Sequence, residues 1–146
     1  MNSSTATSVS NMGLDQNAWA VEPKVAHLAL ITERELTDEE MTALDAGRIH
    51  LMSWRKHADL NKWMEDLWFR KGGTDVFNCI PMPLTEDDLL SLRMHLQVNG
   101  NAYAERGKGF FWGASSEEDI KLDHAFIDKA LNAIAEGYEV YYYCWW

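Results

Sequence analysis

The chain ends on the segment YEVYYYCWW, in which almost every residue is apolar or aromatic. Successive side chains of an extended strand point to opposite faces. One face of this segment therefore carries Tyr138, Val140, Tyr142, Cys144 and Trp146, and the other carries Tyr141, Tyr143 and Trp145. A strand that is apolar on both faces is usually interior or covered. The sequence thus predicts a sheet with the C-terminus inside it.

Three helices are predicted from residues suited to capping a helix start and from glycines that follow the last turn. Thr37 and Glu40 form a capping-box pattern, which predicts a short helix over residues 38–46. Thr85 begins a second helix, which ends at Asn99-Gly100. The third helix begins at SSEED (115–119), with Ser115 or Ser116 as cap, and ends at Gly137.

The stretch from Arg48 to Lys71 is predicted as one amphipathic helix, because its apolar residues recur at helical spacing. The stripe that faces the core contains Ile49, Ser53, Leu60, Trp63, Met64 and Leu67. A second row beside it contains His50, Trp54, His57, Asn61 and Trp68. Two interpretations of this row stay open. The helix is buried on two sides, or the row is a surface for a ligand or a partner.

The rest of the chain is predicted as strands, a loop and an arm. KVAHLALIT (24–32) and GFFWG (109–113) suit short strands, and 99–108 suits a polar loop. TDVFNCIPMPL (74–84) is limited by its prolines to an edge strand or an irregular crossing. Residues 1–22, rich in Ser, Thr and Asn, predict a flexible N-terminal arm before a single domain over 23–146. The fold class is α+β, with a short, largely antiparallel sheet packed with about four helices.

Charge limits the class of partner. The chain has 13 Lys and Arg against 23 Asp and Glu, for a net charge of −10, which disfavours general binding of nucleic acids. Residues 48–71 are the exception, with six basic residues against three acidic ones. The sequence therefore predicts either a basic, Trp- and His-bearing surface on an acidic body, or ion pairing within the molecule.

Motifs for chemistry are not found in the sequence. It contains no phosphate-binding glycine loop, no nucleophile elbow and no recognised metal-ligand spacing among its five histidines, so no catalytic residue, metal or cofactor is predicted. A Ser-His-Asp or Cys-His group stays open, because such residues converge in space rather than in sequence. The two cysteines, Cys79 and Cys144, are expected to be buried, reduced thiols. Without an apolar run of membrane length or a signal peptide, we expect a cytoplasmic protein with no membrane partner.

Several motifs carry a resemblance to a known group of proteins. WRKHADLNKWM (54–64), LTEDDLLSL (84–92), GFFWG (109–113) and YYYCWW (141–146) resemble, in the same order, segments of small uncharacterised proteins of tailed bacteriophages. The likeness covers about residues 50–146; the first 45 or so residues are additional, and Trp112 stands where the group commonly has Phe. Members often carry the label phosphoglycerate kinase. That activity is not supported here, because a two-domain kinase needs several hundred residues and a nucleotide site.

The resemblance implies a non-enzymatic phage accessory protein that binds and modulates a host protein in the host cytoplasm, in host takeover or against host defence. One alternative is a small-ligand binder that sequesters a nucleotide by stacking its base on tryptophan and meeting its phosphate with basic residues. A virion structural component and an enzyme of unrecognised type are further alternatives. The candidate binding residues are Trp54, Arg55, Lys56, His57, Asn61 and Trp68.

Overall fold

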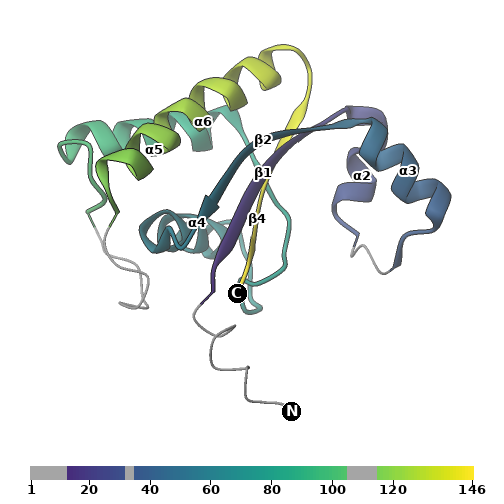
Figure 1. The fold of residues 1–146 in the computed structure, drawn as a ribbon, viewed down its shortest axis with the longest axis horizontal. Helices are drawn as coiled ribbons and strands as arrows, with labels where there is room; N and C mark the ends of the chain where they lie inside the picture. Colours follow the sequence, from purple (N-terminus) through teal and green to yellow (C-terminus); the bar gives the residue numbers. More distant parts are fainter. Residues whose placement is uncertain (1–12, 32–34, 105–114) are drawn as a thin grey trace.

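The fold is built on a four-stranded antiparallel sheet in the order β2-β1-β4-β3. The computed structural model describes residues 13–31, 35–104 and 115–146 (Figure 1). The strands are β1 (Asp15–Val21), β2 (Arg48–Arg55), β3 (Met82–Leu84) and β4 (Glu139–Trp145). Together with the helices they form a small α+β domain, as the sequence predicts. The predicted strand at GFFWG (109–113) and residues 105–108 of the predicted loop lie outside the described residues.

The C-terminal segment forms β4 and lies between β1 and β3, so the prediction of an interior strand is confirmed. Its neighbour β3 is a three-residue edge strand that contains Pro83, in agreement with the edge position predicted from the prolines. On the covered face of β4, Val140, Tyr142 and Cys144 are almost completely buried. On the opposite face Trp145 is 56% exposed.

The prediction of an arm over residues 1–22 is wrong for Asp15–Val21, which form β1 between β2 and β4. The error has a physical cause. Asp, Asn and Gln are poor strand formers, so the sequence of β1 gives little strand signal. Every second residue of β1 is nevertheless small or carries an amide, and these residues fit beneath the helices. They are Gln16, Ala18 and Ala20, and all three are fully buried. Pairing on both sides outweighs the low strand propensity. The domain therefore begins before residue 23.

The predicted single helix over 48–71 is also wrong, because its first part is β2. Ala18 pairs with Met52 and Trp19 pairs with His50, so Leu51 is an extra residue that forms a β-bulge. The bulge brings His50 and Ser53, three residues apart, to the same face of the sheet, where their side chains are 2.9 Å apart. Residues three apart also share one face of a helix, which is why the sequence of β2 reads as helical.

The helices are otherwise close to prediction. They are α3 (Asp38–Ala46), α4 (Ala58–Arg70), α5 (Glu86–Val98) and α6 (Glu117–Ala135). Thr37, Thr85 and Ser116 each form a complete capping box. The strand predicted over 24–32 is wrong, since the structure has a 3-10 turn η1 (Pro23–Val25) and a short helix α2 (Ala26–Ala29) there. Ala and Leu favour helix, and Pro at the first position starts it.

The two faces of the sheet differ in their cover (Figure 1). Side chains of α4, α5 and α6 share one core with Ala18, Trp54 and Tyr142 from one face. On the other face, α2 and α3 pack only over one end, around Val21 and Tyr141. We call this second face, which carries Asp15, Asn17 and Trp19 of β1, the open face. Within the described part of the chain, no helix is long and apolar enough to cross a membrane.

Candidate functional site

The open face presents alternate residues of three neighbouring strands. Because residues paired across an antiparallel sheet point to the same side, the register brings them into rows. Asp15 is paired with both Arg55 and Trp145, Asn17 with Ser53 and Tyr143, and Trp19 with His50 and Tyr141. The open face therefore combines aromatic rings with charged and amide side chains.

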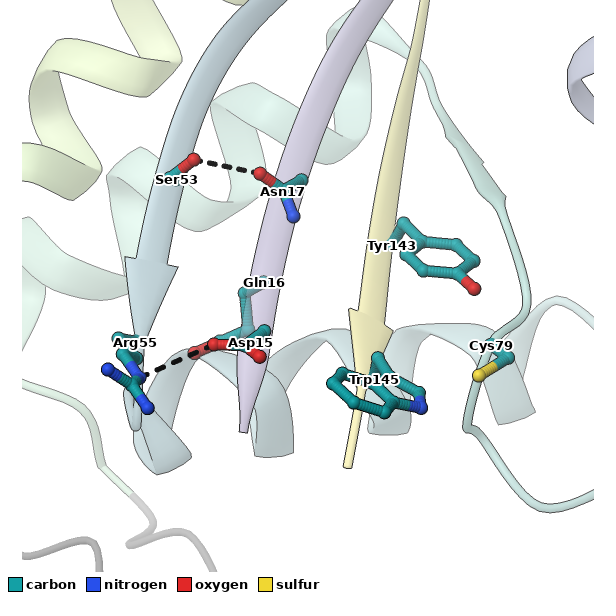
Figure 2. Close-up of a pocket in the computed structure, with 8 residues that line it drawn as sticks. All are labelled: Asp15, Gln16, Asn17, Ser53, Arg55, Cys79, Tyr143 and Trp145. Atoms are coloured by element: carbon teal, nitrogen blue, oxygen red, sulfur yellow. Dashed lines mark hydrogen bonds and ion pairs between the residues drawn. The ribbon is translucent and has the colours of Figure 1, made fainter. Parts of the chain in front are cut away.

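Two hollows lie along this face. The polar hollow, of about 530 Å³, is lined by residues that include Asp15, Arg55 and Trp145 (Figure 2). The apolar hollow, of about 470 Å³, lies toward α2 and α3; its lining includes Val21, Ala29, Ile31, Leu44, Pro81 and Tyr141. Both are also lined by Asn17, Cys79 and Tyr143. The two hollows therefore adjoin, and we call them together the groove, with an apolar end and a polar end; each is of the size of a small-ligand pocket.

Hydrogen bonds fix the polar side chains of the groove. The Ser53 hydroxyl donates to Asn17 Oδ1 over 2.8 Å, and His50 Nε2 lies 2.9 Å from the same oxygen. Since both contacts use the amide oxygen, and the Asn17 amide nitrogen donates to no side chain of the described residues, this nitrogen is available to a ligand. In Figure 2 that nitrogen points away from Ser53.

Aromatic and cationic groups stiffen the apolar end. The Arg48 guanidinium lies 4.3 Å from the ring centroid of Trp19, and the His50 ring meets the same indole edge-on at 4.7 Å. At the polar end, Arg55 Nε lies 3.5 Å from Asp15 Oδ1, with the arginine side chain 77% exposed. An exposed pair of this kind is weak. Its arginine can be recruited by an acidic group of a ligand.

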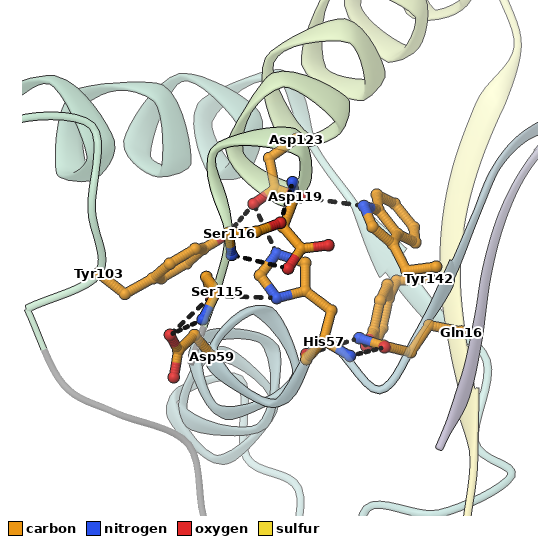
Figure 3. A network of polar contacts seen from close by, with 10 residues as sticks. Gln16, His57, Asp59, Tyr103, Ser115, Ser116, Asp119, Asp123 and Tyr142 are labelled. Atoms are coloured by element: carbon orange, nitrogen blue, oxygen red, sulfur yellow. Dashed lines mark hydrogen bonds and ion pairs between the residues drawn. The ribbon is translucent and has the colours of Figure 1, made fainter. Parts of the chain in front are cut away.

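A second constellation lies beneath the covered face of the sheet, around Asp123 of α6 (Figure 3). Asp123 is fully buried and accepts three hydrogen bonds. They come from Trp54 Nε1 at 2.9 Å, the Tyr103 hydroxyl at 2.7 Å and His57 Nε2 at 2.8 Å. Burial, together with the nearby Asp123 carboxylate, raises the pKa of Tyr103 well above its ordinary value, so the phenol keeps its proton and remains a donor.

His57 is held in place by its backbone as well as by its ring. Its N–H donates to Gln16 Oε1 over 2.9 Å, and its carbonyl accepts from Gln16 Nε2 over 3.0 Å. Gln16 Nε2 also donates to the Tyr142 hydroxyl, which donates to Asn61 Oδ1. Burial raises the pKa of Tyr142 well above its ordinary value. The network therefore links β1, β2, β4, α4 and α6 through satisfied polar groups.

The sequence-derived candidate residues fall into three different environments. Trp54, His57 and Asn61 are buried, at 4%, 1% and 8% exposed, and belong to the network around Asp123. Arg55 and Lys56 are exposed, with Arg55 on the open face and Lys56 in the turn before α4. Trp68 is half-buried, and its ring packs so closely on Gly73 that a Cβ there would lie 2.3 Å from it.

The sequence did not single out Asn17 or Asp123, and it predicted Ser53 on a core-facing helix stripe, whereas Ser53 is exposed on the open face of β2. A signal for Asp123 is nevertheless present, since it lies three residues after Ile120 and four before Ile127 on the buried stripe of α6. A carboxylate in a core stripe requires buried donors. A partial signal for the open face is the aromatic alternation of Tyr141, Tyr143 and Trp145.

No known protein family, curated protein or solved structure matches the chain. The resemblance to the phage group therefore stays a prediction. Among residues 13–31, 35–104 and 115–146, no group of three or more His, Cys, Asp or Glu is placed to hold a metal ion.

Proposed function

We propose that the chain is a binding protein that holds an extended segment of a partner protein in the groove of its open face. The observation that carries this proposal is the continuity of an apolar hollow with a polar one across Asn17, Cys79 and Tyr143. A peptide with an apolar side chain at one end and an acidic group at the other would complement it. No chemical step is needed at this face.

The composition of the groove supports a protein partner. Tyr, Trp and Arg are the residues most enriched among energetic anchors of protein interfaces, and Trp19, Tyr143, Trp145 and Arg55 line this groove. The net charge of −10 opposes a nucleic-acid backbone. If the resemblance to the phage group holds, the partner is a host protein and the chain modulates it.

The nucleotide alternative lacks comparable support. It places a base on Trp54 or Trp68. The Trp54 ring is buried edge-on against Phe126 at 5.0 Å and its N–H is engaged by Asp123. Trp68 lies against Phe77 and Gly73.

A random 12-residue peptide library selected against the immobilised full chain tests the proposal. We expect enriched sequences that pair an apolar residue with an acidic one. Affinity for a selected peptide should fall at least about tenfold, or about 1.4 kcal/mol, in Trp145→Ala and in Arg55→Glu. Met94→Ala on α5 is the matched control, because Met94 is 58% exposed against 56% for Trp145. No enrichment, or equal affinity in all variants, would overturn the proposal.

A further inference from the structure

We propose that Ser115 is a nucleophile for small esters, with His57 as its base and Asp123 as the positioning residue behind the histidine. Ser115 directly precedes the capping residue of α6, and His57 directly precedes α4. Ser115 Oγ lies 3.3 Å from His57 Nδ1, and His57 Nε2 lies 2.8 Å from Asp123 Oδ2. This site is separate from the open face and does not depend on the proposed binding function.

The proton positions follow from the donors around Asp123. A carboxylate oxygen accepts hydrogen bonds, so the 2.8 Å contact with Asp123 Oδ2 favours the tautomer of His57 that carries its hydrogen on Nε2. In that tautomer the lone pair lies on Nδ1, the nitrogen that faces Ser115. The Gln16 side chain bonds both the N–H and the carbonyl of His57, which holds the imidazole between Ser115 and Asp123. The ring is thus ready to accept the serine proton.

Asp59 orients the serine. Its Oδ2 atom accepts from the Ser115 hydroxyl over 2.6 Å and from the Ser115 N–H over 3.3 Å, and the carboxylate is only 2% exposed. Rotation about the Cβ–Oγ bond turns the hydroxyl hydrogen from Asp59 to His57 Nδ1 without moving the oxygen. The backbone contact with Asp59 is kept during this rotation, so the nucleophilic oxygen stays in position.

Ser115 lines a hollow of about 420 Å³ that is open to a ligand. The other lining residues include Glu117 at the N-terminus of α6, and Lys121 and His124 from the next turns. Among the described residues, the backbone N–H groups of Glu117 and Glu118 donate to no other protein group, which makes the helix start a source of donors for a developing oxyanion. A small ester with an anionic substituent near Lys121 and His124 fits this lining.

The reaction balances with water as the second reactant. Ser115 Oγ forms a bond to the ester carbonyl carbon while its proton passes to His57 Nδ1. The carbon–oxygen bond to the alcohol then breaks, and the proton moves from His57 to the leaving oxygen. Water then attacks the carbonyl carbon of the acyl-serine and gives a proton to His57 Nδ1. The bond between that carbon and Ser115 Oγ breaks, His57 returns the proton to Oγ, and the carboxylic acid leaves, which restores the Ser115 hydroxyl.

Covalent labelling of the full chain with a fluorophosphonate, read by peptide mass spectrometry, tests the proposal. The probe loses fluoride as Ser Oγ bonds to phosphorus, and we expect one adduct, on Ser115. Ser115→Ala should lose the adduct and the accompanying hydrolysis of p-nitrophenyl acetate. Ser91→Ala is the control, because Ser91 is exposed on α5 and does not line this hollow, so labelling at Ser115 should remain intact.

Asp123→Asn separates a positioning role from a structural one. In variant protein that circular dichroism shows to be folded, the labelling rate should fall about 100-fold, and its pH profile should change shape. The titratable groups that face His57 are Asp59 of α4, Tyr103 and Asp123 of α6. No adduct on Ser115 in the folded wild-type chain, or a labelling rate in Asp123→Asn equal to wild type, would overturn the proposal. Peptide binding by the open face should be unchanged in Ser115→Ala.

Discussion

The covered and open faces of the sheet come from the same strands but have opposite characters. In β1 the covered face carries Gln16, Ala18 and Ala20, all fully buried, whereas the open face carries Asp15, Asn17 and Trp19. In β2 the neighbours Trp54 and Arg55 make the same division, one 4% exposed and the other with a side chain 77% exposed. The buried set of alternate residues thus stabilises the fold, whereas the exposed set is available for contacts with a partner.

The comparison shows how polar residues differ between the two faces. On the covered face each polar group bonds to another protein group, as in the contacts among Gln16, His57 and Asp123. A buried polar group that loses its partner is costly. On the open face Asn17, Arg55 and Asp15 are in part directed toward the groove, where a ligand can replace water at little cost.

Deletion of residues 1–21 should have the largest effect. It removes β1, which pairs with both β2 and β4, so the loss exceeds the whole stability of a domain, about 5–15 kcal/mol. We expect no cooperative thermal transition in circular dichroism. Deletion of residues 1–12 is the matched control, since it keeps all of β1. A soluble chain that unfolds cooperatively without residues 1–21 would show that β1 is not central.

Trp54→Ala and Arg55→Glu compare adjacent residues on opposite faces. The tryptophan change should cost about 3–5 kcal/mol through a cavity and one lost donor to Asp123. The arginine change should cost less than about 1 kcal/mol, because its ion pair is exposed. Leu60→Ala, at a fully buried position of α4, should cost about 2–5 kcal/mol and serves as the core reference. If urea midpoints show that Arg55→Glu lowers the free energy of unfolding as much as Leu60→Ala does, the assignment of Trp54 and Arg55 to opposite faces is contradicted.

Alkaline pH should destabilise the fold through two buried groups of β4, Cys144 on the covered face and Tyr141 on the opposite face beneath α2 and α3. Burial, and next the Cys79 thiol, raises the pKa of Cys144 from 9.0 to about 12. Burial, and next Glu139, raises the pKa of Tyr141 from 10.0 to about 12. Both groups ionise more readily in the unfolded chain. The stability they contribute is therefore complete below pH 9 and is lost between about pH 9 and 12.

Melting temperatures measured from pH 8 to pH 11 test this prediction. They should be level at first and then fall as the thiol and phenol of the unfolded chain begin to ionise. Cys144→Ser removes one of the titrating groups and should make the decline between pH 9 and 10 shallower. A melting temperature that rises over this range would contradict the assignment of these residues to the core.

Trp145→Ala should have the smallest effect on stability. With 56% of its surface exposed, the indole contributes little burial, and we expect a change below about 1 kcal/mol in the free energy of unfolding. A denaturant titration checks this value. A loss of several kcal/mol would show that the groove is part of the core.

The parts of the fold that the sequence predicts are those with strong local signals. The capping boxes at Thr37, Thr85 and Ser116 and the two-sided apolar pattern of β4 are such signals. β1 has no comparable signal, because Asp15, Asn17 and its alanines acquire their role only through pairing with strands far along the chain. The bulge at Leu51 gives β2 a helix-like spacing.

The candidate sites are harder to predict for the same reason. Asn17 and Ser53 meet only after β1 pairs with β2, and Ser115 meets His57 across 58 residues of sequence. Trp54 and Arg55 are both candidate binding residues of the predicted helix, in which consecutive side chains would lie about 100° apart. A strand places them on opposite faces.

The affinity of a selected peptide for Trp145→Ala and for Trp54→Phe, measured beside the unfolding free energy of each variant, tests the division of the two faces most directly. Trp54→Phe keeps most of the buried ring and removes only the N–H to Asp123. The division predicts that Trp145→Ala loses at least about tenfold in affinity with little change in stability. It predicts that Trp54→Phe loses about 1–3 kcal/mol of stability with unchanged affinity. The reverse pattern, in which affinity follows Trp54 and stability follows Trp145, would contradict it.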